Sequence, residues 1–208
     1  AVQTDVTSPV AVDRLADAIA RQLERQMGVA EPKTAVNRTA QTTPLRAPTS
    51  AGEFVAMHGD AAKKAEQTSG IPATFMVAQA AHETGWGKKQ IRMADGSNSF
   101  NLFGIKASPD WKGPVAKITT TEYVDGLPKK TVQAFRAYSS YDESFADYAR
   151  LMRSSPRYRE VLASAGSANG AQGFAQGLQR AGYATDPAYA DKLGRVINTT
   201  LRLQRSLV

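Results

Sequence analysis

The sequence predicts a mainly α-helical domain that carries one small β-hairpin lobe. Two observations lead to this fold class. Apolar residues recur three or four positions apart through most of residues 51–208, which is the spacing of amphipathic helices. Residues 115–138 break this pattern, because they are rich in β-branched residues and have an Asp-Gly pair in the middle, as hairpins do.

The first fifty residues divide into two stretches. Residues 10–27 look helical, with an apolar stripe at Leu15, Ile19, Leu23 and Met27. Residues 29–50 are rich in Thr, Pro, Ala and Gln, a composition typical of a flexible linker. We therefore expect residues 1–28 to be the tail helix of an upstream domain, residues 29–50 to be a linker, and residues 51–208 to form the compact domain.

Two helices are expected at the start of the compact domain. Ser50 is a candidate N-cap for a helix that runs to about Thr68. Pro72 then opens a second, strongly apolar helix that reaches Glu83. Gly85 and Gly87 end it. Residues 88–114 have no regular pattern and are expected to be irregular.

The hairpin is expected to have its outgoing strand at Val115–Val124, its turn at Asp125–Pro128 and its return at Lys129–Tyr138. Side chains alternate between the two faces of a strand. This alternation puts Glu122 on the same face as Ile118 and Val124.

Four helices are expected after the hairpin. Ser140 and Glu143 form a capping box that opens the first. Ser155-Pro156 opens the next, and residues 171–181 form the third. The last helix follows Asp186, a candidate N-cap, with Pro187 at its first position.

Glu83 is the leading candidate for a catalytic group. It stands at the end of an apolar helix, where a carboxylate loses hydration and its pKa is expected to rise. A glutamic acid that is protonated near neutral pH can act as a general acid. The alternative is a structural carboxylate that caps the glycine turn. The sequence favours catalysis, because perturbed carboxyl groups in such places are often functional.

Composition excludes several kinds of chemistry. The 208 residues include no cysteine, so disulfides, zinc thiolates and a thiol nucleophile are absent. His82-Glu83 begins like a zinc-protease motif, but the second histidine would have to stand where Trp86 is. We expect no metal and no cofactor. No apolar run is long enough for a membrane span. The net charge of +7 favours a polyanionic partner, but the basic residues are scattered, so we expect no nucleic acid.

Four motifs carry a resemblance to a known family. They are the stretches Ala80-Ala81-His82-Glu83-Thr84-Gly85-Trp86-Gly87, Asn101-Leu102-Phe103-Gly104-Ile105-Lys106, Phe135-Arg136-Ala137-Tyr138 and Gly182-Tyr183-Ala184-Thr185-Asp186-Pro187. Together, and in this order, they resemble the glucosaminidase family of peptidoglycan hydrolases, glycoside hydrolase family 73. Within it the chain is most similar to the flagellar group, whose members join a rod-assembly domain to a hydrolase through a linker.

The resemblance implies a lysozyme-like α+β fold and an endo-β-N-acetylglucosaminidase. Such an enzyme cleaves the β-1,4 bond that links N-acetylglucosamine to N-acetylmuramic acid in peptidoglycan. It further implies a periplasmic location, a role in opening the wall for the flagellar rod, and contact with rod proteins through the N-terminal region. Muramidase specificity, and a non-catalytic module that binds the wall or scaffolds the rod, are the alternatives.

The resemblance also assigns site residues. Glu83 matches the catalytic acid. Glu122 is the best candidate for the second carboxylate that glycoside hydrolysis normally needs, with Asp95 and Asp110 as weaker alternatives. Tyr183 would stabilise the transition state or hold water, or else only pack. The expected substrate contacts are Trp86, Asn98, Asn101, Lys106 and Tyr138, with Trp86 alternatively a packing anchor.

Overall fold

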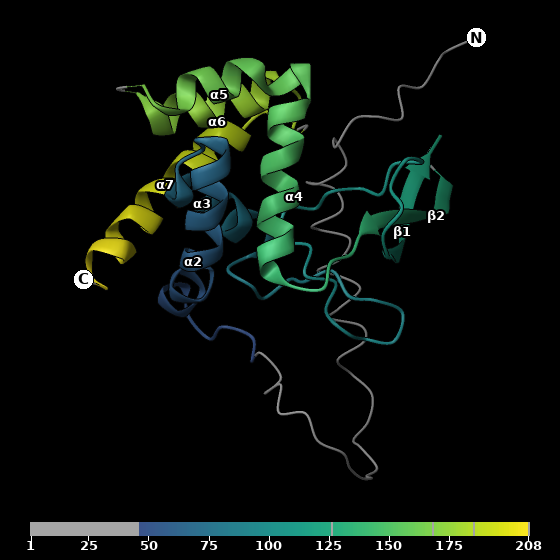
Figure 1. Cartoon of the computed structure of the whole chain (residues 1–208). Coiled ribbons are helices and arrows are strands. Elements are labelled where there is room, and N and C mark those ends of the chain that lie inside the picture. Colours follow the sequence, from purple (N-terminus) through teal and green to yellow (C-terminus); the bar gives the residue numbers. More distant parts are fainter. Residues whose placement is uncertain (1–45, 126, 168, 185, 208) are drawn as a thin grey trace, which may run out of the picture.

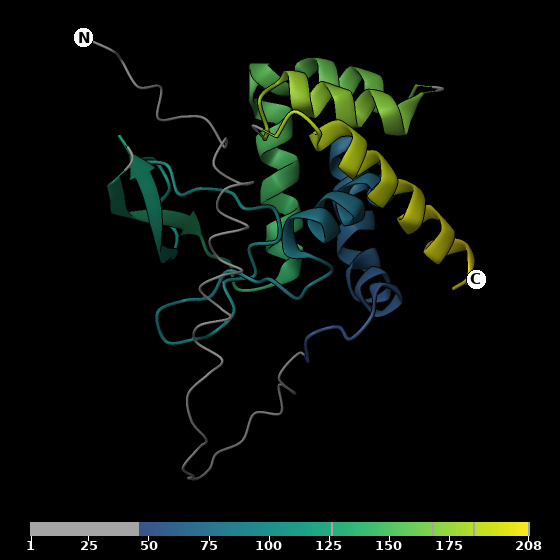
Figure 2. The ribbon, with the colours of Figure 1, turned by 180° about the vertical axis from the view of Figure 1, so that it is seen from behind.

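The structure is a computed structural model, which describes residues 46–207 apart from 126, 168 and 185, and only the backbone of residues 120–124. The helices gather into one body and the hairpin stands to one side of it, as both views show (Figures 1 and 2). This is the mainly α plan with a small β lobe that the sequence predicts. The expected tail helix at residues 1–28 lies outside the described residues, as does the expected linker up to residue 45.

The first two helices begin and end close to where the sequence predicts. Helix α2 spans Ala51–Ser69, and its N-cap Ser50 accepts a hydrogen bond from the Glu53 amide. Gly70 ends this helix in the left-handed conformation. Helix α3 spans Ala73–Thr84 after Pro72, and nine of its twelve residues are buried. A helix that is apolar on nearly all sides has to lie in the middle of the fold.

Four further helices and one 3₁₀ turn follow the hairpin. The capping box opens α4, Tyr141–Ser154, where the Ser140 hydroxyl accepts from the Glu143 amide at 3.2 Å. A 3₁₀ turn η1, Pro156–Tyr158, leads into α5, Arg159–Ala165, and α6 spans Gly170–Arg180. Helix α7 spans Tyr189–Arg205 and packs along α3, while α4 packs on α2 (Figure 1).

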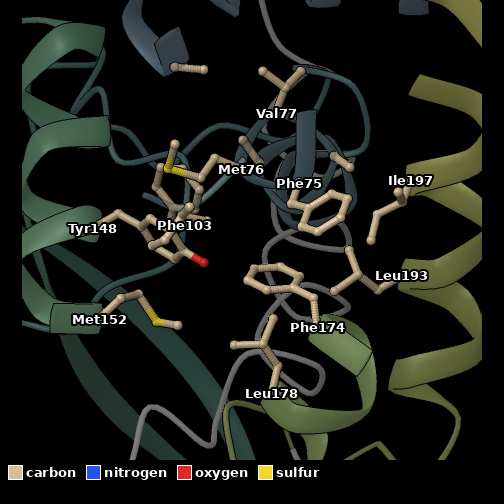
Figure 3. Close-up of a cluster of buried hydrophobic side chains, with 14 of the residues drawn as sticks. Phe75, Met76, Val77, Phe103, Tyr148, Met152, Phe174, Leu178, Leu193 and Ile197 are labelled. Atoms are coloured by element: carbon tan, nitrogen blue, oxygen red, sulfur yellow. The ribbon is translucent and has the colours of Figure 1, made fainter. Parts of the chain in front are cut away.

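The core lies where these helices meet. In the part shown in Figure 3, Phe75 of α3 faces Phe174 of α6, with Leu193 and Ile197 of α7 beside them. The Phe75 and Phe174 rings are 5.2 Å apart, a distance at which aromatic rings attract each other. The Tyr148 side chain reaches in from α4. The core therefore holds α3 through its buried residues.

The last helix begins later than the sequence predicts. Asp186 is not its N-cap, because α7 starts at Tyr189 and its N-cap Ala188 makes no side-chain capping bond. Instead the Asp186 carboxylate accepts a hydrogen bond from the Ala188 amide at 2.8 Å, and the Asp186 carbonyl accepts from the Tyr189 amide. Aspartate often forms such local turns, and here the turn precedes the helix.

The hairpin exists where it is expected, but its turn is tighter. Strand β1, Val115–Val124, pairs antiparallel with β2, which spans Leu127–Arg136 instead of Lys129–Tyr138. Val124 pairs with Leu127, so only two residues connect the strands. Asp125 has a φ of +52°, the left-handed conformation that two-residue hairpin turns favour. At the base, Ala116 and Phe135 pack with Ile91 in a small cluster separate from the main core.

The packed domain also starts a little before residue 51. Pro48 is buried, and the Thr49 amide donates to the Glu53 carboxylate at 2.8 Å. The last residues of the expected linker are therefore part of the folded domain. Pro48 is held in the domain by a close contact with Gly87.

Candidate active site

Glu83 lies on the last turn of α3. It is partly buried, as is the preceding His82, while the following Thr84 is buried. A side chain in this position has a rigid base, because α3 is packed against α2 and α7. The partial exposure leaves the carboxyl group within reach of a ligand.

The turn that follows Glu83 has an unusual backbone. Gly85, Trp86 and Gly87 have φ values of +55°, +59° and +85°, so three successive residues are left-handed. This conformation is natural for glycine but strained for tryptophan. The Thr84 hydroxyl secures the turn, because it donates to the Ala80 carbonyl at 2.7 Å and accepts from the Gly87 amide at 2.9 Å.

Gly87 is needed for space as well as for conformation. A Cβ atom at this position would lie 2.6 Å from Cγ of Pro48 and 3.2 Å from Cδ2 of Phe54. Trp86 packs edge-on against the Phe54 ring at 6.0 Å, beside the main core. Pro48 and Phe54 thus support the turn from behind, and Trp86 has the contacts of a packing anchor.

A buried tyrosine holds the Glu83 carboxyl group. The Tyr189 hydroxyl, from the first turn of α7, donates to Oε1 of Glu83 at 3.2 Å. Tyr189 in turn accepts from Nε2 of Gln79 at 3.4 Å. Burial, followed by the nearby Glu83 carboxylate, raises the pKa of Tyr189 well above its usual range. Tyr189 therefore remains a hydrogen-bond donor throughout the ordinary pH range.

Tyr183 lies next to this tyrosine but is engaged elsewhere. Its ring stacks on that of Tyr189 with 6.2 Å between the centroids, and its hydroxyl donates to the Phe103 carbonyl at 2.8 Å. It is 1% exposed, and burial is the main cause that raises its pKa well above the usual range. In this arrangement Tyr183 ties the loop before α7 to the loop that contains Phe103.

The side-chain amide of Asn101 makes its hydrogen bonds to nearby backbone groups. Nδ2 donates to the carbonyls of Ile105 and Arg136, and Oδ1 accepts from the amides of Phe103 and Ile105. An asparagine side chain has two donor hydrogens and two acceptor lone pairs, so all four are used. Asn101 is 3% exposed and these bonds shape the loop, while its expected contact with a sugar stays a prediction.

Asn98 and Lys106 stand at the two ends of this loop. Asn98 donates to the Tyr141 hydroxyl at 2.9 Å and accepts from the Phe100 amide. The Lys106 backbone forms an isolated bridge to Phe135 at the base of the hairpin. Both side chains are partly exposed.

Tyr138 is tied to a second carboxylate. Its hydroxyl donates to Oδ2 of Asp147 at 2.6 Å, and Asp147 also accepts from Arg136 and Arg150. The Arg136 guanidinium lies over the Trp111 ring, 4.8 Å from its centre. Tyr138 is 8% exposed and its hydroxyl belongs to this network, while its expected contact with substrate stays a prediction.

Glu122 is placed only through its backbone. It pairs with Lys129 in the outer part of the hairpin, and its side chain lies outside what the structure describes. The two weaker alternatives belong to loops. Hydrogen bonds from Ser97 lower the pKa of Asp95, and a hydrogen bond from Ser108 lowers the pKa of Asp110.

The sequence does not reveal that Gln79 and Tyr189 lie beside Glu83. A faint signal existed, because Gln79 is a polar residue in an apolar helix, one turn before Glu83 and on the same face. Tyr189 stands 106 residues from Glu83, so nothing local could pair them.

The part of the chain that the structure describes has neither a cluster of metal ligands nor a membrane-spanning helix. It contains no group of three or more His, Asp or Glu side chains that could hold a metal ion. It also contains no helix with the length and apolar character needed to cross a membrane.

The chain matches known proteins over most of its length. The sequence profile of the glucosaminidase family, described as mannosyl-glycoprotein endo-beta-N-acetylglucosaminidase, matches residues 59–202. The peptidoglycan hydrolase FlgJ of Escherichia coli (strain K12) is 51% identical over 144 residues, which are 69% of this chain and 45% of that protein. The chain thus spans less than half the length of this relative.

Solved structures give the same result. The peptidoglycan hydrolase from Sphingomonas sp. A1 is 48% identical, with a TM-score of 0.65 over 76% of this chain and 95% of that one. The glycoside hydrolase domain from Salmonella typhimurium FlgJ, in a C-terminally truncated form, is 46% identical, with a TM-score of 0.64 over 74% and 99% of the two chains. With its lysozyme-like arrangement of helices and hairpin, this chain belongs to the glucosaminidase family of glycoside hydrolases.

Proposed function

We propose that the chain hydrolyses the glycan strands of peptidoglycan and that Glu83 is its general acid. The observation that carries the proposal is the position of Glu83 at the end of the buried helix α3, with its Oε1 atom held by Tyr189. Membership of the glucosaminidase family, and relatives that are named peptidoglycan hydrolases, support the substrate class. The net charge of +7 is suited to an anionic polymer.

In the proposed reaction, Glu83 transfers its proton to the glycosidic oxygen as the bond from that oxygen to the anomeric carbon breaks. The bond is the β-1,4 linkage on the reducing side of N-acetylglucosamine. Water then attacks the anomeric carbon and gives up a proton. The Glu122 carboxylate is the proposed base for this step, in keeping with the two-carboxylate scheme. If Glu122 does not take this role, the carbonyl oxygen of the substrate's own N-acetyl group attacks first and water completes the hydrolysis.

The other proposed roles follow from the contacts described above. Tyr183 supports the site by holding the loop at Phe103, and once its hydroxyl is released it stabilises the developing positive charge or holds the attacking water. Trp86, Asn98 and Lys106 are the proposed substrate contacts, because each is partly exposed near the loops that flank Glu83. Asn101 and Tyr138 contribute by fixing those loops.

The experiment is digestion of purified peptidoglycan, borohydride reduction of the products and mass spectrometry. We expect fragments that end in reduced glucosamine from the native protein and none from Glu83→Gln. Glu160→Gln, a matched change of an exposed glutamate on α5, serves as control and should retain full activity. Fragments that end in reduced muramic acid would instead identify a muramidase. Wall binding without turnover would overturn the proposal in favour of a binding module.

We further propose that the enzyme acts in the periplasm, where it opens the wall for the flagellar rod, and that the N-terminal region contacts rod proteins. The flagellar relatives support this. A flagellated host that carries only Glu83→Gln should assemble fewer flagella and swim poorly, whereas Glu160→Gln should swim normally. Normal swimming with the inactive enzyme would remove the flagellar role and leave the hydrolase assignment intact.

A further inference from the structure

Three fully buried side chains connect the centre of the core to Glu83. Tyr148 of α4 donates to Oε1 of Gln79, Nε2 of Gln79 donates to the Tyr189 hydroxyl at 3.4 Å, and Tyr189 donates to Oε1 of Glu83 at 3.2 Å. All three are 0% exposed. Figure 3 shows the Tyr148 hydroxyl pointing from α4 towards the middle of the hydrophobic cluster. We call Tyr148, Gln79 and Tyr189 the relay.

The hydrogen bonds of the relay all run in one direction. The carbonyl oxygen of Gln79 can only accept, so Tyr148 must donate to it. The amide nitrogen of Gln79 can only donate, so the Tyr189 oxygen must accept from it. Tyr189 is then left with its single proton, and the neighbouring acceptor is Oε1 of Glu83. The orientation of one amide therefore decides that Tyr189 is a donor to Glu83.

A donor fixed at one carboxyl oxygen determines where the acidic proton resides. In a protonated carboxyl group the carbonyl oxygen is a stronger acceptor than the hydroxyl oxygen, so the Tyr189 hydrogen at Oε1 favours the form that carries its proton on Oε2. We propose that Tyr189, oriented by Gln79 and Tyr148, is a positioning residue that keeps Oε1 of Glu83 an acceptor and so confines the acidic proton of Glu83 to Oε2. This inference rests on the proposed role of Glu83 as general acid.

Two properties make the relay suited to this task. Its members are neutral, so it can hold the carboxyl group in both the protonated and the ionised state. Its burial among the aromatic rings of the core leaves the side chains little freedom to turn, since Tyr148 stacks on Phe103 at 4.1 Å and Tyr189 stacks on Tyr183. The raised pKa of Tyr189 keeps its own proton in place while Glu83 titrates.

The central test is Tyr189→Phe, which removes one oxygen and keeps the ring. We expect kcat to fall about tenfold to a hundredfold with KM unchanged, because a hydrogen bond to a charged group is lost. Tyr189 stabilises the ionised form of Glu83, so its removal should move the basic limb of the pH–activity profile to higher pH by about one unit. A loss of folded protein would lower kcat but would not move this limb.

Two further variants sharpen the test. Gln79→Met removes the orienting amide but leaves the Tyr189 hydroxyl, so it should cause a smaller fall in kcat than Tyr189→Phe, with the same direction of pH shift. Tyr158→Phe is the matched control. Tyr158 is 2% exposed and lies outside the relay, so its variant should keep the native pH profile. A carbon-13 titration of the Glu83 carboxyl group would report the same shift without any substrate.

The outcomes separate this inference from the proposed function. A native pH profile and titration in Tyr189→Phe, together with an inactive Glu83→Gln, would overturn the relay and leave the general acid in place. Activity in Glu83→Gln would overturn both. A shifted profile in Tyr189→Phe and Gln79→Met, but not in Tyr158→Phe, would support the relay.

Discussion

Two carboxylates of this fold, Asp147 and Glu83, each accept a hydrogen bond from a tyrosine, yet their surroundings differ. Asp147 lies between Arg136 and Arg150 as well as Tyr138, and its side chain is 3% exposed. Glu83 is partly buried and accepts from Tyr189, the end of a chain of neutral groups. Two of the three hydrogen-bond donors around Asp147 are therefore cations. The Tyr189 hydroxyl is a neutral donor, which can bond to a carboxyl group in either protonation state, as the proposed acid role of Glu83 requires.

The largest expected effect is that of Glu83→Gln on catalysis. Glutamine is nearly the same size but has no acidic proton to donate, so kcat should fall by at least about a thousandfold, at the strong end of general-acid contributions. Stability should change little, because the amide oxygen can still accept from Tyr189. Steady-state kinetics and thermal unfolding of the same samples would measure both. Substantial remaining activity would mean that Glu83, like Asp147, has a structural rather than a catalytic role.

Asp147→Asn should mainly lower stability and leave the pH dependence of catalysis unchanged. The change removes the charge between two arginines and disturbs the bond from Tyr138, so unfolding should become easier by about 3–5 kcal/mol. Denaturant titration would give this value from the midpoint. The protein that remains folded should keep the native pH–activity profile. A shifted profile would mean that the network at Asp147 reaches the chemistry after all.

His58 extends the comparison to a buried titratable group with no hydrogen-bond partner among the described residues. It is 0% exposed, with the Phe54 and Tyr141 rings 4.4 Å and 4.6 Å away. Burial lowers its pKa from 6.5 to about 4. The folded state therefore disfavours the proton that the unfolded chain takes up. The contribution of neutral His58 to the free energy of unfolding is complete above about pH 7. That free energy should fall by roughly 3 kcal/mol as the pH drops from 6.5 through 4.

The variant His58→Phe tests this. It should unfold with a weaker pH dependence between pH 4 and 7, and it should be more stable than the native protein at pH 4.5. Denaturant midpoints across this range would measure the difference. An unchanged dependence would show that carboxyl groups, rather than His58, set the acid limit of the fold.

The smallest expected effect comes from Tyr138→Phe, the counterpart of Tyr189→Phe. It removes a hydroxyl from the other carboxylate, so stability should fall by about 1.5–3 kcal/mol, as for a hydrogen bond to a charged group. The pH–activity profile should not move. Equal shifts of the profile in both tyrosine variants would mean that neither hydroxyl is specific to Glu83.

The fold could be predicted well because its signals are local. Ser50 and the pair Ser140 and Glu143 cap helices where their sequence pattern predicts. The Asp125 turn was predicted too long, since the register of the strands rather than composition sets its length. Asp186 is the clearest miss, because the same side chain can cap a helix or form a turn before one, and sequence does not distinguish these.

The candidate site could be predicted only in part. The position of Glu83 at the end of an apolar helix could be predicted, because the apolar run and the glycines after it are visible in the sequence. Its partner Tyr189 could not be, since their contact joins residues 106 positions apart. Asn101 shows the converse limit. A polar residue in a family motif can bind a ligand or hold its own loop, and the sequence alone does not reveal the four hydrogen bonds that its amide makes here.

The contact between Pro48 and Gly87 has a practical consequence for anyone who shortens this protein. A boundary chosen from composition would begin at residue 51 and would remove Pro48, whose ring fills the space behind the left-handed turn after Glu83. Such a truncated enzyme would also lose the Ser50 cap and the bond from Thr49 to Glu53. Versions meant for crystallisation, immobilisation or fusion to another domain should therefore begin no later than Arg46, which pairs with Glu53.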